Sequence, residues 1–215
     1  MLLLIHRRLA TLAALATALL LANCAHQQPA PTYTEDGKFI NPYPPGTYDH
    51  FKAEPTYPKT MAVWKNEELL AKTDPSNSTL HILLGPQRGL LMNGDEVVMD
   101  YPICSGRNGY ETPKGEYKIL EKIVDKESNR YGRIYNADGV CVNSDADILN
   151  DPVPEGGRFD GAPMRYWMRL TNDGIGHHIG PVKRYRASHG CIRGPAGAVP
   201  TVHHKVALGT KVIVQ

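Results

Sequence analysis

The chain has 215 residues, of which 24 are Lys or Arg and 22 are Asp or Glu, so its formal net charge at pH 7 is +2. A balance this close to neutrality gives no support to a nucleic-acid partner or any other strongly charged partner, and none is expected. The length suits one domain with a single hydrophobic core, preceded by segments of different composition.

The first 24 residues have the order of a secretory signal. Two basic residues, Arg7 and Arg8, precede an uninterrupted apolar run from Leu9 to Ala22. This order is typical of a signal peptide. The run is shorter than the roughly 20 residues that a transmembrane helix needs. A cleaved signal is therefore favoured over a retained anchor.

The end of that signal, Leu21-Ala22-Asn23-Cys24, resembles a bacterial lipobox, in which the cysteine is lipidated and becomes the mature N-terminus. This resemblance implies a lipoprotein that is attached to the membrane through Cys24 and located in the periplasm or cell envelope. Ala25 after the cysteine favours the outer membrane. Ordinary secretion and a retained anchor stay open, because lipoboxes usually have Gly, Ala or Ser where this chain has Asn23.

Residues 25–59 follow the signal, residues 1–24, and differ from it in composition. They are rich in Pro, Tyr, Thr and Gly and show neither helical nor strand periodicity. Such a composition predicts an extended tether. A single domain is then expected over residues 60–215.

The domain is predicted to be mainly β with a few short helices. Residues 60–72 place apolar side chains in one stripe at helical spacing, so a short helix is expected there. Three β-rich stretches follow, TLHILLG, RGLLMNGDEVVMDYPICSG and GEYKILEKIV, and the second contains a turn at Asn93-Gly94. Residues 125–163 are polar and irregular. Their length predicts a functional lid or a binding insertion.

A strand is predicted over residues 164–170, and a turn leads to a returning strand, IGHHIG. Neighbouring strand residues point to opposite faces, so His177 and His178 cannot both enter one site. His178 shares its face with Gly176 and Gly180, which would leave room for a substrate to approach the backbone. His177 shares its face with two isoleucines, which suggest packing. His178 is therefore the predicted site residue.

Ten residues after His178 begins the sequence SHGCIRGP, which contains Cys191. A thiol becomes a nucleophile when a histidine takes its proton or holds it as thiolate, and a strand can deliver an imidazole to a cysteine on a loop. Gly190 would let the backbone turn so that amides near Cys191 face an oxyanion. His189 lies too close in sequence to face the cysteine as its base and is assigned to the pocket wall.

The pattern IGHHIG…SHGCIR resembles the signature of the L,D-transpeptidases of the YkuD type: a histidine, a spacer, Ser/Thr-His-Gly-Cys, an aliphatic residue, and Asn or Arg. The segment QRGLLMNGDEVVMDYPICSGRNGYETPKGEYKI is similar to the opening segment of that family, and GTKVIV is similar to its closing strand. The resemblance covers about residues 80–214. It implies an L,D-transpeptidase-like β-sandwich.

The resemblance further implies chemistry on the peptide stems of bacterial peptidoglycan. Cys191 would be the nucleophile and His178 its base. Cys191 would attack the carbonyl of the third stem residue and expel D-alanine, and the thioester would pass to an amine or, in an L,D-carboxypeptidase, to water. No cofactor is implied. The substrate and oxyanion pocket would be completed by Ser188, His189, Gly190, Arg193 and Tyr166.

Two interpretations from other classes stay open. A zinc site would use His177 or His178 with His189 and Cys191, and His203 as a fourth ligand, although the chain has neither a C-x-x-C nor an H-E-x-x-H motif. A non-catalytic wall-binding module would keep the fold without turnover.

Three further points are left open by the sequence. The acceptor of the thioester is not specified, so crosslinking, protein attachment, exchange and hydrolysis all remain. Cys104 and Cys141 can pair in an oxidising compartment or stay free. His203 and His204 are expected on a surface helix.

Overall fold

The computed structural model describes residues 32–183 and 185–215, so the signal and Cys24 lie outside the described residues. Two compact units are present, Met1–Pro44 and Pro45–Gln215. Within its described part the first unit contains a two-stranded antiparallel sheet, β1 (Thr32–Tyr33) and β2 (Phe39–Ile40). No helix in the described ranges is long and apolar enough to cross a membrane.

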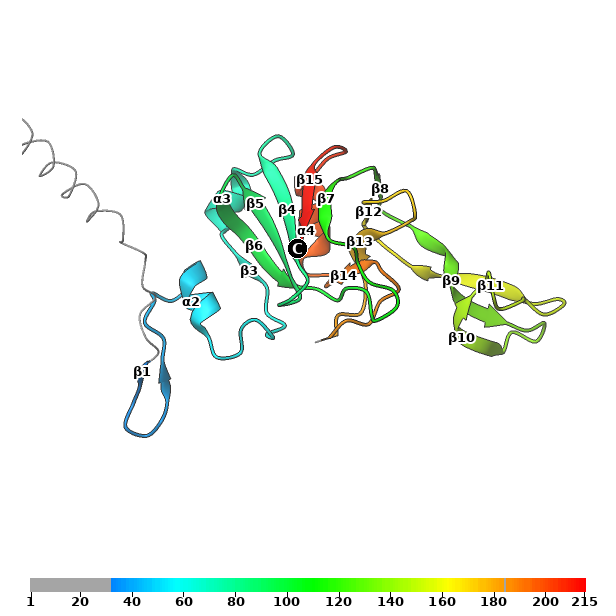
Figure 1. Cartoon of the computed structure of the whole chain (residues 1–215), viewed down its shortest axis with the longest axis horizontal. Coiled ribbons are helices and arrows are strands. Elements are labelled where there is room, and N and C mark those ends of the chain that lie inside the picture. The colour runs from blue at the N-terminus through cyan, green and yellow to red at the C-terminus, as the bar shows by residue number, and fades with distance from the viewer. Residues whose placement is uncertain (1–31, 184) are drawn as a thin grey trace, which may run out of the picture. The chain divides into compact units, whose positions relative to one another are not determined.

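The described part of the second unit contains three β-sheets, and the two larger ones enclose its core (Figure 1). The larger sheet has six strands in the order β3-β6-β5-β4-β15-β7, and all its neighbours are antiparallel except β4 and β15. Its strands are β3 (Trp64–Lys65), β4 (Ser78–Leu83), β5 (Arg88–Asn93), β6 (Glu96–Pro102), β7 (Gly115–Lys118) and β15 (Lys211–Val214).

The smaller sheet has four strands in the order β14-β13-β12-β8. β13 and β14 are parallel, and the other pairs are antiparallel. A short helix, α4 (Val199–Lys205), follows β14 and leads to β15. The strands are β8 (Glu121–Ile123), β12 (Trp167–Arg169), β13 (Gly176–Ile179) and β14 (Ile192–Gly194).

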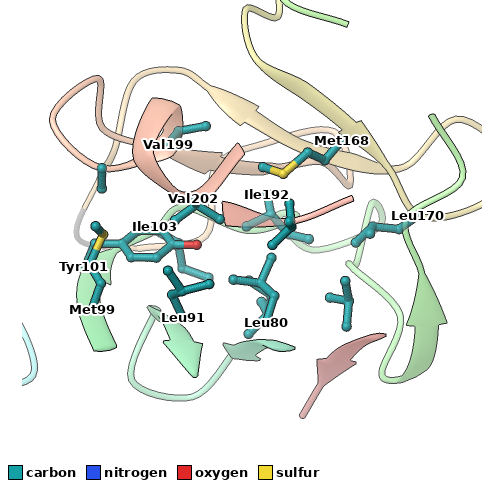
Figure 2. Packing of buried hydrophobic residues seen from close by; sticks show 14 of the residues in the cluster. Leu80, Leu91, Met99, Tyr101, Ile103, Met168, Leu170, Ile192, Val199 and Val202 are labelled. Carbon is teal, nitrogen blue, oxygen red and sulfur yellow. The ribbon is translucent and has the colours of Figure 1, made fainter. Parts of the chain in front are cut away.

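The hydrophobic core lies between these sheets. Leu80 and Leu91 of the larger sheet face Met168 and Ile192 of the smaller sheet (Figure 2). Helix α4 adds Val199 and Val202 to this core. Each such side chain contributes about 1.5–3 kcal/mol when it is removed from water. Two packed sheets with few short helices confirm the predicted mainly β sandwich.

Residues 125–163, expected to be irregular, instead form a three-stranded antiparallel sheet in the order β10-β9-β11. Bulges interrupt the pairing of β9 with both of its neighbours. A bulge shifts the side-chain alternation by one residue, so the period of a strand is not visible in this sequence. The strands are β9 (Glu127–Tyr135), β10 (Cys141–Asp147) and β11 (Arg158–Pro163).

The helix expected over residues 60–72 is shorter than predicted. Residues 64–65 pair with β6 as strand β3, and the helix α3 covers only Glu67–Ala71. Asn66 ends the strand and begins the helix, because its side-chain oxygen accepts a hydrogen bond from the backbone N–H of Leu69 at 3.0 Å. Such an N-cap fixes the first turn and prevents an earlier start.

Residues 45–59, assigned above to the tether, belong to the second compact unit and include helix α2 (Tyr48–Ala53). They pack on a fully buried ion pair in which Arg88 Nε lies 2.6 Å from Asp100 Oδ1. The hydroxyl groups of Tyr48 and Tyr57 donate to the other carboxylate oxygen, at 2.9 and 3.2 Å. These contacts join residues far apart in the sequence, so local periodicity cannot predict them.

Candidate active site

The parallel pairing of β13 with β14 determines which side chains share a face of the smaller sheet. His178 lies beside Arg193 in this register. Extending the register by two residues puts Gly176 beside Cys191, at the entrance to β14. Side chains two residues apart on a strand point to the same side. His178, Arg193 and Cys191 are therefore on one face, with His178 diagonal to the thiol.

His177 lies on the opposite face, in the core, and is fully buried. Its Nδ1 is 2.8 Å from the carbonyl oxygen of Ile192, and its Nε2 is 3.0 Å from the hydroxyl oxygen of Tyr101. A carbonyl only accepts, so Nδ1 carries the proton and Nε2 accepts from the tyrosine. Burial lowers the pKa of His177 to about 4. His177 is thus a neutral core residue with both nitrogens occupied.

His178 has one nitrogen fixed and is only 5% exposed. Its Nδ1 lies 2.7 Å from the carbonyl oxygen of Ile179 and must carry the proton. The lone pair of Nε2 is therefore the basic site of the ring. Burial is the main cause that lowers the pKa of His178 to about 4, and the charge of Arg193 adds to it. The imidazole is neutral at physiological pH.

The glycines on the face of His178 were expected to leave room for a substrate, and this expectation is wrong. Gly176 and Gly180 do not leave empty space for a substrate. A Cβ at Gly176 would lie 2.5 Å from an indole carbon of Trp167, and a Cβ at Gly180 would lie 2.9 Å from Cγ of Arg193. Both glycines admit protein side chains to the face that carries His178, because only a residue without Cβ allows such close approach.

Cys191 is half-buried at the entrance to β14, and its Sγ lies 3.8 Å from the carbonyl oxygen of Gly174. Burial raises the pKa of the Cys191 thiol, while the backbone N–H of Gly176 and the charge of Arg193 act in the opposite direction. Because burial is the largest of these effects, the thiol is protonated at neutral pH. It needs a base to become a nucleophile.

The loop before Cys191 is held by its own polar groups. Ser188 is fully buried; its Oγ accepts from the backbone N–H of Gly190 at 3.2 Å and donates to the carbonyl oxygen of Cys191 at 2.5 Å. Gly190 has φ +107°, a region that favours glycine. Its carbonyl oxygen accepts from Thr112 Oγ at 2.6 Å. The Ser188 hydroxyl therefore shapes the loop, and Thr112, within ETPKG, braces it from outside.

His189 lies at the meeting point of the loop and the insertion. Arg107 donates to its Nε2 at 2.8 Å, and its ring stacks on Tyr131 of β9 with centroids 4.4 Å apart. A guanidinium only donates, so Nε2 accepts and Nδ1 carries the proton. His189 is thus a hydrogen-bond donor at Nδ1 and has no free basic nitrogen. The sequence analysis missed Arg107, in the SGRNG turn, and Tyr131, in the insertion.

The profile of the YkuD family, described as the L,D-transpeptidase catalytic domain, matches residues 77–214. The chain belongs to this family. No curated protein matches its sequence.

Solved L,D-transpeptidases share the fold of this YkuD domain. One from Mycobacterium smegmatis has a TM-score of 0.50 and 19% identity, covering 65% of this chain and 58% of that one. One from Stackebrandtia nassauensis has a TM-score of 0.47 and 16% identity, covering 78% of this chain and 63% of that one. A mutant L,D-transpeptidase from Enterococcus faecium has a TM-score of 0.47 and 21% identity, covering 66% of this chain and 50% of that one. The chain thus spans less than two thirds of the length of these structures.

In the YkuD domain Tyr166 packs against the core and α4. Tyr166 has φ +56°, and its ring meets the rings of His203 and His204 edge-on, with centroids 5.4 and 6.0 Å apart. Its predicted contact with substrate stays a prediction. His203 and His204 lie on α4 as expected, but His203 is turned inward and buried, while His204 is exposed.

The residues of the alternative zinc site are not gathered in this domain. His177 is in the core, His189 is bonded to Arg107, and His203 lies on α4 against the ring of Tyr166. In residues 32–183 and 185–215, no group of three or more His, Cys, Asp or Glu is placed to hold a metal ion. Cys104 is buried, Cys141 is exposed, and neither forms a disulfide.

Proposed function

We propose that this YkuD domain is a cysteine-dependent L,D-transpeptidase that acts on the tetrapeptide stems of peptidoglycan. The observation that carries the proposal is the placement of Cys191 and His178 on one face of adjacent strands, with the proton of His178 fixed at Nδ1. This leaves Nε2 as a base on the face of the nucleophile. His177 and His189 have no basic nitrogen to offer in its place.

The reaction has two halves that balance in protons. Nε2 of His178 takes the thiol proton as the sulfur of Cys191 bonds to the carbonyl carbon of the third stem residue. The C–N bond to D-alanine then breaks, and the imidazolium gives its proton to the leaving amine. In the second half an acceptor amine attacks the thioester, His178 takes a proton from it, and the thiolate of Cys191 recovers that proton as it leaves.

The surrounding groups suit a substrate that carries carboxylates. Arg193 lies beside His178 on the same face, and Arg107 lies behind His189. A guanidinium pairs with a carboxylate through two parallel hydrogen bonds. The Nδ1–H of His189 adds a neutral donor. We assign these groups, together with the loop of Ser188 and Gly190, to binding of the stem.

The test is incubation of the purified protein with synthetic tetrapeptide stems, with and without an amine acceptor, followed by mass spectrometry of the products. Release of D-alanine together with an acceptor-linked tripeptide supports transpeptidation. Tripeptide alone, even with excess amine, would identify the L,D-carboxypeptidase that is the alternative. Intact tetrapeptide after long incubation would contradict both. Cys141→Ala, which removes an exposed cysteine, is the matched control for Cys191→Ala.

We also propose that the protein is a lipoprotein of the cell envelope, held in the outer membrane through Cys24. The support is the sequence of the export signal alone. A diacylated N-terminus binds a membrane far more firmly than a polar tether does. Cys24→Ala should therefore move the protein from the membrane fraction to the soluble fraction. Unchanged retention in the membrane would indicate an uncleaved signal anchor instead.

A further inference from the structure

A tryptophan stands directly across from the proposed base. In the antiparallel pairing of β12 with β13, Arg169 is opposite Gly176 and Met168 is opposite His177, so Trp167 is opposite His178. The two rings lie with centroids 6.0 Å apart and planes inclined by 47°. Trp167 is 1% exposed. Its indole thus closes the side of the imidazole that faces away from β14.

The indole also contacts the strand segment that lies beside Cys191. It extends over the backbone of Gly176, where an added Cβ would lie 2.5 Å from an indole carbon. Gly176 is beside Cys191 in the register of the sheet, and its N–H interacts with the thiol sulfur. One rigid ring therefore contacts the strand segment that carries both the base and the amide facing the sulfur.

The orientation of this ring is fixed from the adjacent strand. The indole N–H donates to Oε2 of Glu121, on β8, at 2.8 Å. Nε of Arg169 donates to the same oxygen at 3.3 Å, so the carboxylate is held by two donors. A charged acceptor makes a hydrogen bond about twice as strong as a neutral one. Packing is enough to bury Trp167. The hydrogen bond to the Glu121 carboxylate also fixes which way the indole ring is turned.

We propose that Trp167, anchored by Glu121, is a positioning residue that holds the imidazole of His178 in line with Cys191. The inference rests on the proposed function, because it assumes that His178 serves as the base. The titratable or charged groups around His178 are Arg193 on β14, Cys191 at the entrance to that strand, and His177 on the opposite face of the sheet. Glu121 is on β8, which pairs with the edge of β12 away from β13, so its effect on His178 is expected to pass through the indole that it anchors.

The test is a double-mutant cycle with Trp167→Phe, Glu121→Ala and the double variant, in the full-length protein. Trp167→Phe keeps an aromatic ring but removes the N–H. It should lower kcat by about tenfold to a hundredfold, the cost of a small misplacement of a catalytic group, and leave KM within about twofold. Glu121→Ala should lower kcat similarly, and the double variant should be no slower than Trp167→Phe. Unchanged kcat in Trp167→Phe, or multiplied losses in the double variant, would overturn the proposal.

Two further variants keep the result interpretable if Trp167→Phe folds poorly. Glu121→Gln retains an oxygen that accepts from the indole, so its kcat should stay within about threefold of the wild type, well above that of Glu121→Ala. Glu116→Ala removes a comparable carboxylate, which pairs with Lys211 at 3.0 Å on the other sheet, and should leave kcat unchanged. Equal losses in Glu121→Gln and Glu121→Ala would contradict an anchoring role for the oxygen.

A second measurement separates this proposal from the proposed function. The alkylation rate of Cys191 by iodoacetamide, followed on its tryptic peptide, needs the base but no stem substrate. It should fall in Trp167→Phe and Glu121→Ala in parallel with kcat. If the wild type does not turn over stems but alkylation still depends on Trp167, the function is wrong and the positioning role stands. If the wild type turns over stems normally and Trp167→Phe changes neither alkylation nor kcat, only the positioning role fails.

Discussion

The hydrogen-bond partners of His177, His178 and His189 determine which ring nitrogen of each carries the proton. Each ring has one nitrogen next to a group that can only accept or only donate: a carbonyl for His177 and His178, a guanidinium for His189. The partner fixes the position of the proton without reference to pKa. His177 uses its other nitrogen on Tyr101, and His189 is left with an N–H. Among the described residues no donor occupies Nε2 of His178, so this nitrogen is the one available for the proposed role of general base.

Replacement of the two neighbouring histidines should give opposite results. His178→Ala should reduce turnover by about 10²- to 10⁴-fold, the usual contribution of a general base, with little change in melting temperature. His177→Ala leaves the buried Tyr101 hydroxyl without its partner and should cost about 1–3 kcal/mol of stability but retain most turnover. Steady-state kinetics and thermal unfolding of both variants check this. Loss of turnover in folded His177→Ala alone would reverse the assignment.

The pH dependence follows from the thiol and the imidazole. Burial raises the pKa of Cys191, so the thiolate fraction is small at neutral pH and increases as pH rises through that raised value. Alkylation of Cys191 by iodoacetamide should therefore be slow and dependent on His178 at neutral pH, and should rise further as the pH becomes strongly alkaline. Turnover, which needs neutral His178, should fall only as pH drops towards about 4, where that imidazole gains a proton. Fast, pH-independent alkylation below pH 7 would instead indicate a preformed thiolate–imidazolium pair.

The segment before the β-sandwich is fixed by a buried charge. The guanidinium of Arg88 bonds Asp100 and also the carbonyl oxygens of Thr60 and Ala62, at 2.8 and 3.1 Å. The rings of Phe51 and Tyr57 lie over it, each 5.5 Å from its central carbon. Besides the bond between the two side chains, four hydrogen bonds join this pair to residues 48–62. We therefore expect the contacts of this segment to contribute to the free energy of unfolding of the domain.

Asp100→Ala should be strongly destabilising. It leaves the guanidinium of Arg88 buried without a counter-charge and removes the acceptor of two tyrosine hydroxyls, so a loss of about 3–5 kcal/mol is expected in urea unfolding. Limited proteolysis should then cleave residues 45–59 first. Asp125→Ala, which breaks an exposed ion pair with Arg165, is the control and should change stability by less than about 1 kcal/mol. An equally small effect for Asp100→Ala would mean that the segment only rests on the domain.

Elements with a regular period were predictable, and those set by distant contacts were not. The alternation over residues 164–170 correctly separates the core face of Met168 from the outer face of Trp167, although the strand itself covers only three residues. The insertion was missed as a sheet because bulges break its period. Residues 45–59 were taken for a tether because their aromatic side chains serve a partner some 40 to 50 residues away.

At the scale of the whole molecule, the site is an arrangement of several elements across one sheet face. The motif SHGC and the strand IGHHIG together indicate a cysteine and its histidine, and the fold puts both on one face. The supporting groups come from elsewhere: Arg107 from the turn after β6, Tyr131 from the insertion, and Glu121 from β8. Their places follow from strand order and register, which no local pattern in the sequence specifies.

In the proposed reaction Cys191 carries the acyl group during turnover. The most direct test is mass spectrometry of acid-quenched protein after brief mixing with a tetrapeptide stem and no amine acceptor. We expect an adduct on the peptide containing Cys191, with the mass of the stem without its D-alanine. This adduct should form much more slowly in His178→Ala and should be absent from Cys191→Ala. Release of D-alanine by Cys191→Ala at the wild-type rate, or an adduct on another residue, would contradict this role of Cys191.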